Sequence, residues 1–203
     1  MTQQDKMLKI MAARTRVCQM TLNVVFAGVF GENRPADRVV AFFLKNRRQC
    51  GAKDRRLISA LIFATFRWWG WLRSIAPSGL VEGYQSKEFE AEDEDGTLYS
   101  GPFEASWAER MMLAAFCLDR PDWPDSEYAD ICEYWAQNAQ IDLQALVSAS
   151  NTSKADIVGI FTDDQEAVSE LQLAPEWIWD EIGAQIDRTE LLGWLGRRPP
   201  MWL

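Results

Sequence analysis

The segment between Asp54 and Arg73 places apolar side chains at intervals of three and four residues, the spacing of one face of an α-helix. The stripe consists of Leu57, Ile58, Leu61, Ala64, Thr65, Trp68 and Leu72. Asp54 stands before it as a residue that can cap the helix. Because a helix with one apolar face must bury that face against other elements, we expect Asp54–Arg73 to be central to a helical core.

Similar spacing recurs along the chain and predicts an all-α fold. We expect helices over residues 4–30, 36–45, 104–117 and 126–136, two short helices around 143–149 and 164–171, and a closing pair that starts at Pro175 and Thr189. Trp68, Trp69 and Trp71 follow one another so closely that they point around the helix and cannot all be core. We expect Trp68 to be buried, and Trp69 or Trp71 to pack under the acidic segment or against a further domain. Packing explains these tryptophans better than stacking against RNA bases does.

Residues 77–103 break this pattern. The segment contains four glycines and an acidic run over residues 88–97, which predicts an irregular acidic insertion, with a short hairpin around Asp95-Gly96. Its acids lack the spacing and the turn glycine of a calcium-binding loop.

The charge is distributed unevenly along the chain. The net charge of −9 combines a net charge of +10 over residues 1–75 with −19 over the remainder. A basic front half can bind RNA through one face, and it can equally serve to attract the acidic half within the fold. The asymmetry alone does not choose between these two interpretations.

Residue types that the chain lacks exclude several kinds of chemistry. There is no histidine, which excludes Ser-His and Cys-His nucleophiles and histidine-bound metals. The four cysteines are scattered and form no C-x-x-C pair, so a zinc site or a disulfide framework is not expected. The polar start of the chain is unlike a secretory signal, and no apolar run is long enough for a membrane span. We therefore expect a cytoplasmic protein with reduced thiols and no membrane partner.

The last residues of the chain indicate how it is divided into domains. After the closing helix pair, Pro199-Pro200 forces extended backbone, so Met201-Trp202-Leu203 reads as the beginning of a strand. We expect that strand to continue into a further domain beyond Leu203.

These features resemble the RsmB/NOL1/NOP2/Sun family of S-adenosylmethionine-dependent RNA 5-methylcytosine methyltransferases. The resemblance rests on three segments in the family's order: Ala13–Val17, Lys53–Arg67, and Leu173–Leu203 with its Pro175-x-Trp177 start and its Pro199-Pro200 step. It implies a NusB-like helical bundle over 1–172, with the acidic insertion inside it, and linker helices over 173–203 leading to a methyltransferase domain. The implied function is RNA binding and positioning for an rRNA (cytosine-C5) methyltransferase.

The chain itself lacks the family's catalytic features, so we assign no catalytic, cofactor-binding or metal-binding residue. None of Cys18, Cys50, Cys117 and Cys132 stands in the family's nucleophile contexts, and no glycine-rich turn follows a strand to hold a cofactor. We interpret Cys117 and Cys132 as buried small apolar residues. S-adenosylmethionine is implied only for the missing catalytic domain.

The basic residues are the remaining candidates. Arg14 and Arg16 lie where the antitermination factor NusB and its relatives carry RNA-contacting arginines, and further cations flank one turn nearby. The expected RNA-binding residues are Lys9, Arg14, Arg16, Arg47, Arg48, Arg55 and Arg56. Arg67 lies within the apolar helix, and we expect it to form an internal ion pair. The alternative is a stand-alone helical protein-interaction module of NusB-like fold, whose acidic part meets a basic partner.

Overall fold

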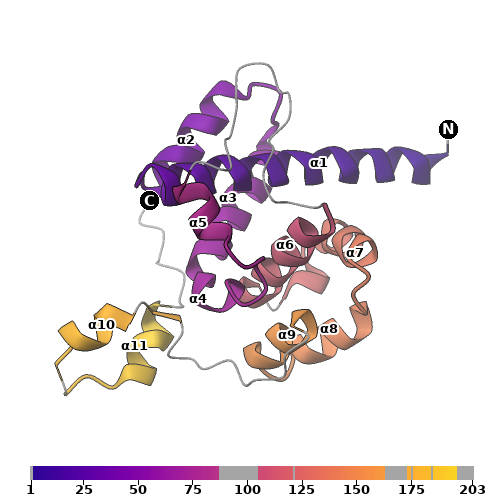
Figure 1. Ribbon diagram of the computed structural model, residues 1–203. Coiled ribbons are helices and arrows are strands. Elements are labelled where there is room, and N and C mark those ends of the chain that lie inside the picture. Colours follow the sequence, from indigo (N-terminus) through magenta and orange to yellow (C-terminus); the bar gives the residue numbers. More distant parts are fainter. Residues whose placement is uncertain are drawn as a thin grey trace.

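The computed structural model describes residues 2–86, 105–120, 122–162, 173–174, 176–183 and 185–195, and in these ranges all regular structure is helical (Figure 1). The predicted all-α class is confirmed. The α-helices are α1 (Gln3–Phe26), α2 (Ala36–Asn46), α3 (Ala52–Arg67), α4 (Trp69–Leu72), α5 (Leu80–Gln85), α6 (Ala105–Asp119), α7 (Ala129–Asn138), α8 (Leu143–Ser150), α9 (Lys154–Phe161), α10 (Glu176–Glu181) and α11 (Arg188–Leu195). A π-helical turn, η1 (Ala27–Gly31), extends α1, and a 3₁₀ turn, η2 (Trp123–Asp125), precedes α7.

Helix α3 is central to the bundle, as its apolar stripe predicts. It packs against α1, α2 and α6, and the predicted stripe is buried along its length. Leu61, in the middle of the stripe, has no exposed surface. In the facing helix α6, every residue from 111 to 118 is buried, so much of the core lies between α3 and α6.

The predicted single helix from Asp54 to Arg73 is interrupted at Trp68. Its backbone there (φ −103°, ψ 12°) leaves the helical region, and α4 begins again at Trp69. Trp68 and Trp71 are both in the core, each 3% exposed, whereas Trp69 is not, so the expectation that Trp68 is buried and that the three are not all core is confirmed. Trp69 is half-buried against Phe26 and Phe30.

The segment 77–103, which was expected to be irregular, is helical near its beginning. Residues 80–85 form α5, whose Leu80 and Tyr84 are buried. The hydroxyl of Tyr84 donates a hydrogen bond of 2.8 Å to Oδ1 of Asn23, a buried residue near the end of α1. This contact fixes the short helix to the bundle. The acidic run itself lies outside the described residues.

The remaining boundaries agree with the sequence in most places. Helices α1, α2, α6, α7, α8, α10 and α11 fall where they were expected. The structure adds α9, which the sequence analysis did not predict, and it packs against α8 and α6. The helix expected near 164–171 and the strand expected from Met201 lie outside the described residues, and the boundary at 172 stays a prediction. Helices α10 and α11 are seen in Figure 1 away from the other helices.

The first turns of α1 project beyond the bundle (Figure 1). Every residue from 2 to 10 is exposed, and Met7, Leu8 and Ile10 are 44–47% exposed. Met7 and Leu8 continue the face on which Met11 is buried, because they precede it by four and three residues. The core-facing stripe of α1 therefore extends past the bundle.

Candidate nucleic-acid interface

The connection between α2 and α3 gathers the densest positive charge in the sequence. Residues 45–56, which we call the basic corner, contain six lysines and arginines and a single acid, Asp54. The cations are Lys45, Arg47, Arg48, Lys53, Arg55 and Arg56. The segment includes four of the seven residues predicted to bind RNA.

Arg55 stabilises the backbone of the basic corner. Its Nε donates to the carbonyl oxygen of Cys50 and its Nη2 to that of Arg47, both at 3.0 Å. These carbonyls follow the end of α2, where backbone acceptors have no partner within the helix and a cation is favoured by the helix dipole. Arg55 therefore shapes the turn, because its Nε and Nη2 both donate to backbone carbonyls of the corner.

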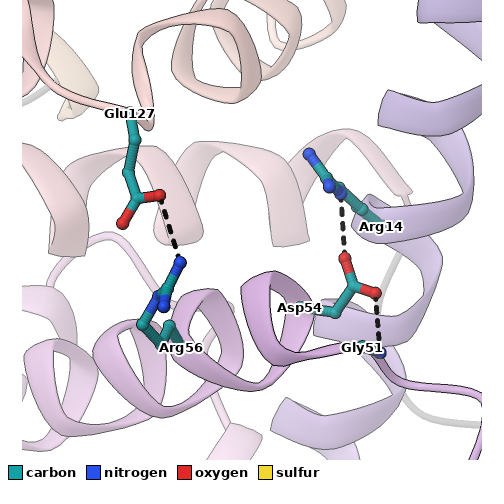
Figure 2. A network of polar contacts seen from close by, with 5 residues as sticks. All are labelled: Arg14, Gly51, Asp54, Arg56 and Glu127. Atoms are coloured by element: carbon teal, nitrogen blue, oxygen red, sulfur yellow. Dashed lines mark hydrogen bonds and ion pairs between the residues drawn. The ribbon is translucent and has the colours of Figure 1, made fainter.

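Arg14 also has a structural role, because it joins α1 to the start of α3. Its Nε donates to Oδ1 of Asp54 at 2.9 Å, and the backbone N–H of Gly51 donates to Oδ2 at 3.1 Å (Figure 2). Both side chains of the ion pair are 30% exposed. Asp54 thus closes the N-terminus of α3 from its first turn, and Arg14 neutralises the only acid of the corner.

Arg47 and Arg56 are engaged more loosely. The guanidinium of Arg47 lies 5.1 Å from the ring centroid of Phe43. Nη2 of Arg56 lies 3.5 Å from Oε2 of Glu127, with the two side chains 58% and 50% exposed (Figure 2). An exposed pair of this kind contributes about 0–1 kcal/mol, so Arg56 can exchange its partner at little cost.

Arg16 and Arg48 are exposed and have no polar partner among the described residues. Lys53 is likewise exposed and has no polar partner among the described residues. It flanks the same turn as Arg55 and Arg56 in the sequence but is not among the seven expected RNA-binding residues. Lys9 is exposed as well. Arg14 and Arg16 are not neighbours in space, because residues two apart on a helix lie about 160° apart around its axis.

A pocket of about 220 Å³ lies between α1 and the basic corner and is lined by residues of both. Val17, Leu57 and Ile58 contribute to its apolar wall. Gln49 and the Arg14–Asp54 ion pair add polar groups, and Ala13 lines it from α1.

The helical spacing of α1 places further cations around the pocket. Ala13 lies between Lys9, four residues before it, and Arg16, three residues after it, on one side of the helix. Across the pocket, Gln49 follows Arg48 directly. The pocket is therefore bordered by positive charge from two separate elements.

The thiols near this pocket and in the core are not reactive groups. Cys18 and Cys50 line the pocket, and burial, with the nearby Asp54 carboxylate, raises the pKa of both thiols. Cys117 and Cys132 are fully buried, as predicted, and burial raises the pKa of each. A thiol with a raised pKa stays protonated and is a poor nucleophile. Within the described residues, no group of three acids or cysteines is arranged to hold a metal ion.

The expected internal role of Arg67 is confirmed. Its guanidinium forms a close ion pair with Asp119 at the end of α6, and the two side chains are only 14% and 4% exposed. Together with the Arg56–Glu127 pair, this contact joins the basic front half to the acidic remainder. Part of the charge asymmetry is therefore internal, whereas Arg16, Arg48 and Lys53 are not paired with an acid among the described residues.

None of the described helices combines the length and the apolar character that a membrane span needs. Comparisons of the chain with protein families, with curated proteins and with solved structures found no match.

Proposed function

We propose that the chain binds RNA through the basic corner and the facing side of α1. In this proposal it is the N-terminal RNA-binding and positioning domain of an S-adenosylmethionine-dependent rRNA (cytosine-C5) methyltransferase, whose catalytic domain follows. The observation that carries RNA binding is the set of exposed cations without partners, Arg16, Arg48 and Lys53, on both sides of one pocket. The methyltransferase context rests on the sequence resemblance, as does the NusB-like form of the bundle.

The arrangement suits a phosphate backbone for physical reasons. Arginine donates two parallel hydrogen bonds to a phosphate, and Asp54 repels phosphate less because Arg14 neutralises it. With a few such contacts, we expect weak binding, with a dissociation constant of roughly 10⁻⁴–10⁻⁶ M, that weakens steeply as salt is added. Selection of one RNA sequence would then come from the catalytic domain.

Charge reversal tests this proposal, provided that the reversed residues have no structural role. The variants are Arg48→Glu and the double variant Arg16→Glu/Arg48→Glu. Arg73→Glu is the matched control, because Arg73 is equally exposed but lies past the far end of α3, a helix about 24 Å long. Binding of a short RNA, measured by fluorescence anisotropy over a range of salt concentrations, should weaken for the first two variants only. Each lost phosphate contact should reduce the salt slope by about one.

Other arginines are unsuitable for this experiment. Glutamate in place of Arg14 would face Asp54, its present ion-pair partner. Nη2 of Arg110 donates to the carbonyl oxygen of Phe161 at 2.9 Å, and the guanidinium of Arg120 lies 4.9 Å from the ring centroid of Tyr128. Reversing any of these would disturb packing as well as charge.

Equal RNA binding by Arg16→Glu/Arg48→Glu and the parent would reject the proposal. The second candidate would then take its place, a helical module that binds another protein. The exposed apolar tip of α1, with Met7 and Leu8 extending the buried face of the helix, favours this candidate.

A further inference from the structure

We infer that the pocket beside the basic corner receives one unpaired base of the RNA, while Arg16, Arg48 and Lys53 hold the neighbouring phosphates. The inference rests on the proposed RNA binding and specifies its form: single-stranded RNA with one base turned into the protein. It assigns a ligand to the pocket and explains why the cations lie on two sides of it.

The size and wall of the pocket match a single base. At about 220 Å³ it is smaller than the roughly 300–1,000 Å³ of pockets that enclose drug-sized molecules, so it has room for one ring system without its sugar and phosphate. Val17, Leu57 and Ile58 present apolar side chains to it. The flat faces of a base are apolar enough to displace water from such a wall.

The polar groups of the pocket match the edge of a base. Arg14 has five N–H donors, and only its Nε binds Asp54. Each carboxylate oxygen of Asp54 accepts one hydrogen bond and can accept another. Gln49 adds an amide with both a donor and an acceptor. A base also carries donors and acceptors side by side on its Watson–Crick edge, so these groups can bind it without breaking the ion pair.

The charge around the pocket favours nucleic acid over a protein side chain as the occupant. An apolar side chain would fill the wall but would leave Arg16 and Arg48 without a counterpart, whereas a base arrives attached to phosphates on both sides. In a duplex the faces of a base are stacked and its edge is paired, so only an unpaired base can enter. The pocket therefore predicts a preference for single-stranded RNA.

Two neighbouring alanines of α1 provide the test. Ala12 and Ala13 are both exposed, and only Ala13 lines the pocket. Ala13→Phe should obstruct the pocket, and Ala12→Phe adds the same side chain one position away, with every cation retained in both. The probes are a single-stranded RNA, the same RNA with one abasic position, and a blunt-ended RNA duplex of equal charge.

Ala13→Phe should weaken single-strand binding by about fivefold, the low end of the range for a base stacked on an aromatic ring, because this wall is aliphatic. It should leave duplex binding and the salt slope unchanged, and Ala12→Phe should behave like the parent on all three RNAs. A 2-aminopurine base in the single strand should change its fluorescence on binding to the parent and much less on binding to Ala13→Phe. If circular dichroism shows that Ala13→Phe is unfolded, Gln49→Trp obstructs the pocket from the exposed turn instead.

The outcomes separate this inference from the proposed function. If the parent binds no RNA, the proposed function and this inference both fail. If the parent binds the single strand and the duplex equally, and a folded variant with an obstructed pocket binds as the parent does, RNA binding stands and the base pocket is rejected. That result would leave the pocket to an apolar side chain of a protein partner.

Discussion

The ion pair between Arg67 and Asp119 shows how much one buried contact can contribute. It joins the end of α3 to the end of α6, and its side chains are 14% and 4% exposed. Removing one partner leaves a buried charge without compensation, which costs about 3–5 kcal/mol. We therefore expect Asp119→Ala to lower the free energy of unfolding by about that amount in urea titrations.

The exposed Arg56–Glu127 pair is the control for this experiment. Glu127→Ala should cost less than about 1 kcal/mol, because water already solvates both charges. The double variant Arg67→Met/Asp119→Ala should recover much of the loss, since it leaves no unpaired charge. A loss below 1 kcal/mol for Asp119→Ala would show that the pair is solvated in solution.

Glu109 gives stability a dependence on pH. Its side chain is buried in α6 and accepts a hydrogen bond of 3.1 Å from Nδ2 of Asn138, and burial raises the pKa of its carboxyl group. In acid, below the pKa of the unfolded chain, both states are protonated and the carboxyl costs nothing. As pH rises from that value through the folded pKa, the unfolded state loses its proton first, so stability falls.

Glu109→Gln keeps the acceptor for Asn138 and removes the titration. The variant should therefore match the parent near pH 4 and be more stable at pH 7, as measured by thermal unfolding. A difference between the two proteins that does not change with pH would contradict the burial of this carboxyl group.

Among the elements, α9 shows that a capping signal can be more informative than an apolar pattern. Ser153 accepts a hydrogen bond of 3.1 Å from the backbone N–H of Asp156, and its hydroxyl donates to the Asp156 carboxylate at 2.7 Å. This is the spacing of a capped helix start, and it was present in the sequence. Ser153→Ala should lower the free energy of unfolding by about 0.5–2 kcal/mol.

The control for the cap is Ser153→Asp, which can still accept the hydrogen bond and should cost little. Both variants are compared by urea unfolding. If the two substitutions are equally destabilising, the side-chain cap is not what stabilises the start of α9.

The long helices could be predicted from the sequence because their apolar stripes are repeated over several turns, as in α3. The interruption at Trp68 could not, because no glycine or proline marks it and the packing of two tryptophans decides it. Helix α5 is only six residues long and is held by the contact between Tyr84 and Asn23, which lie 61 positions apart in the sequence. At the candidate site, composition identified the cations, but only the fold shows that Arg14 and Arg55 are used internally while Lys53 is not.

At the scale of the whole molecule, the state of the four thiols bears on the proposed methyltransferase context. Transfer of a methyl group to C5 of cytosine uses a thiolate nucleophile, and burial raises the pKa of all four thiols. The sequence also lacks a glycine-rich turn after a strand. We expect the 203-residue chain neither to bind S-adenosylmethionine in calorimetry nor to methylate RNA. Saturable heat of binding would show that a cofactor site exists here.

The π-helical turn η1 at the end of α1 lies directly against α2. A Cβ atom on Gly28 would lie 2.7 Å from Cγ2 of Val39, so α2 crosses η1 with no space between them. The remaining turns of α2 form an arm of about 10 Å that ends at the basic corner, where Gln49 and Cys50 form one edge of the pocket. A methyl group at Gly28 would therefore require Val39 or α2 to shift, and a shift of α2 would move Gln49 and Cys50 and change the size of a pocket that Gly28 does not touch.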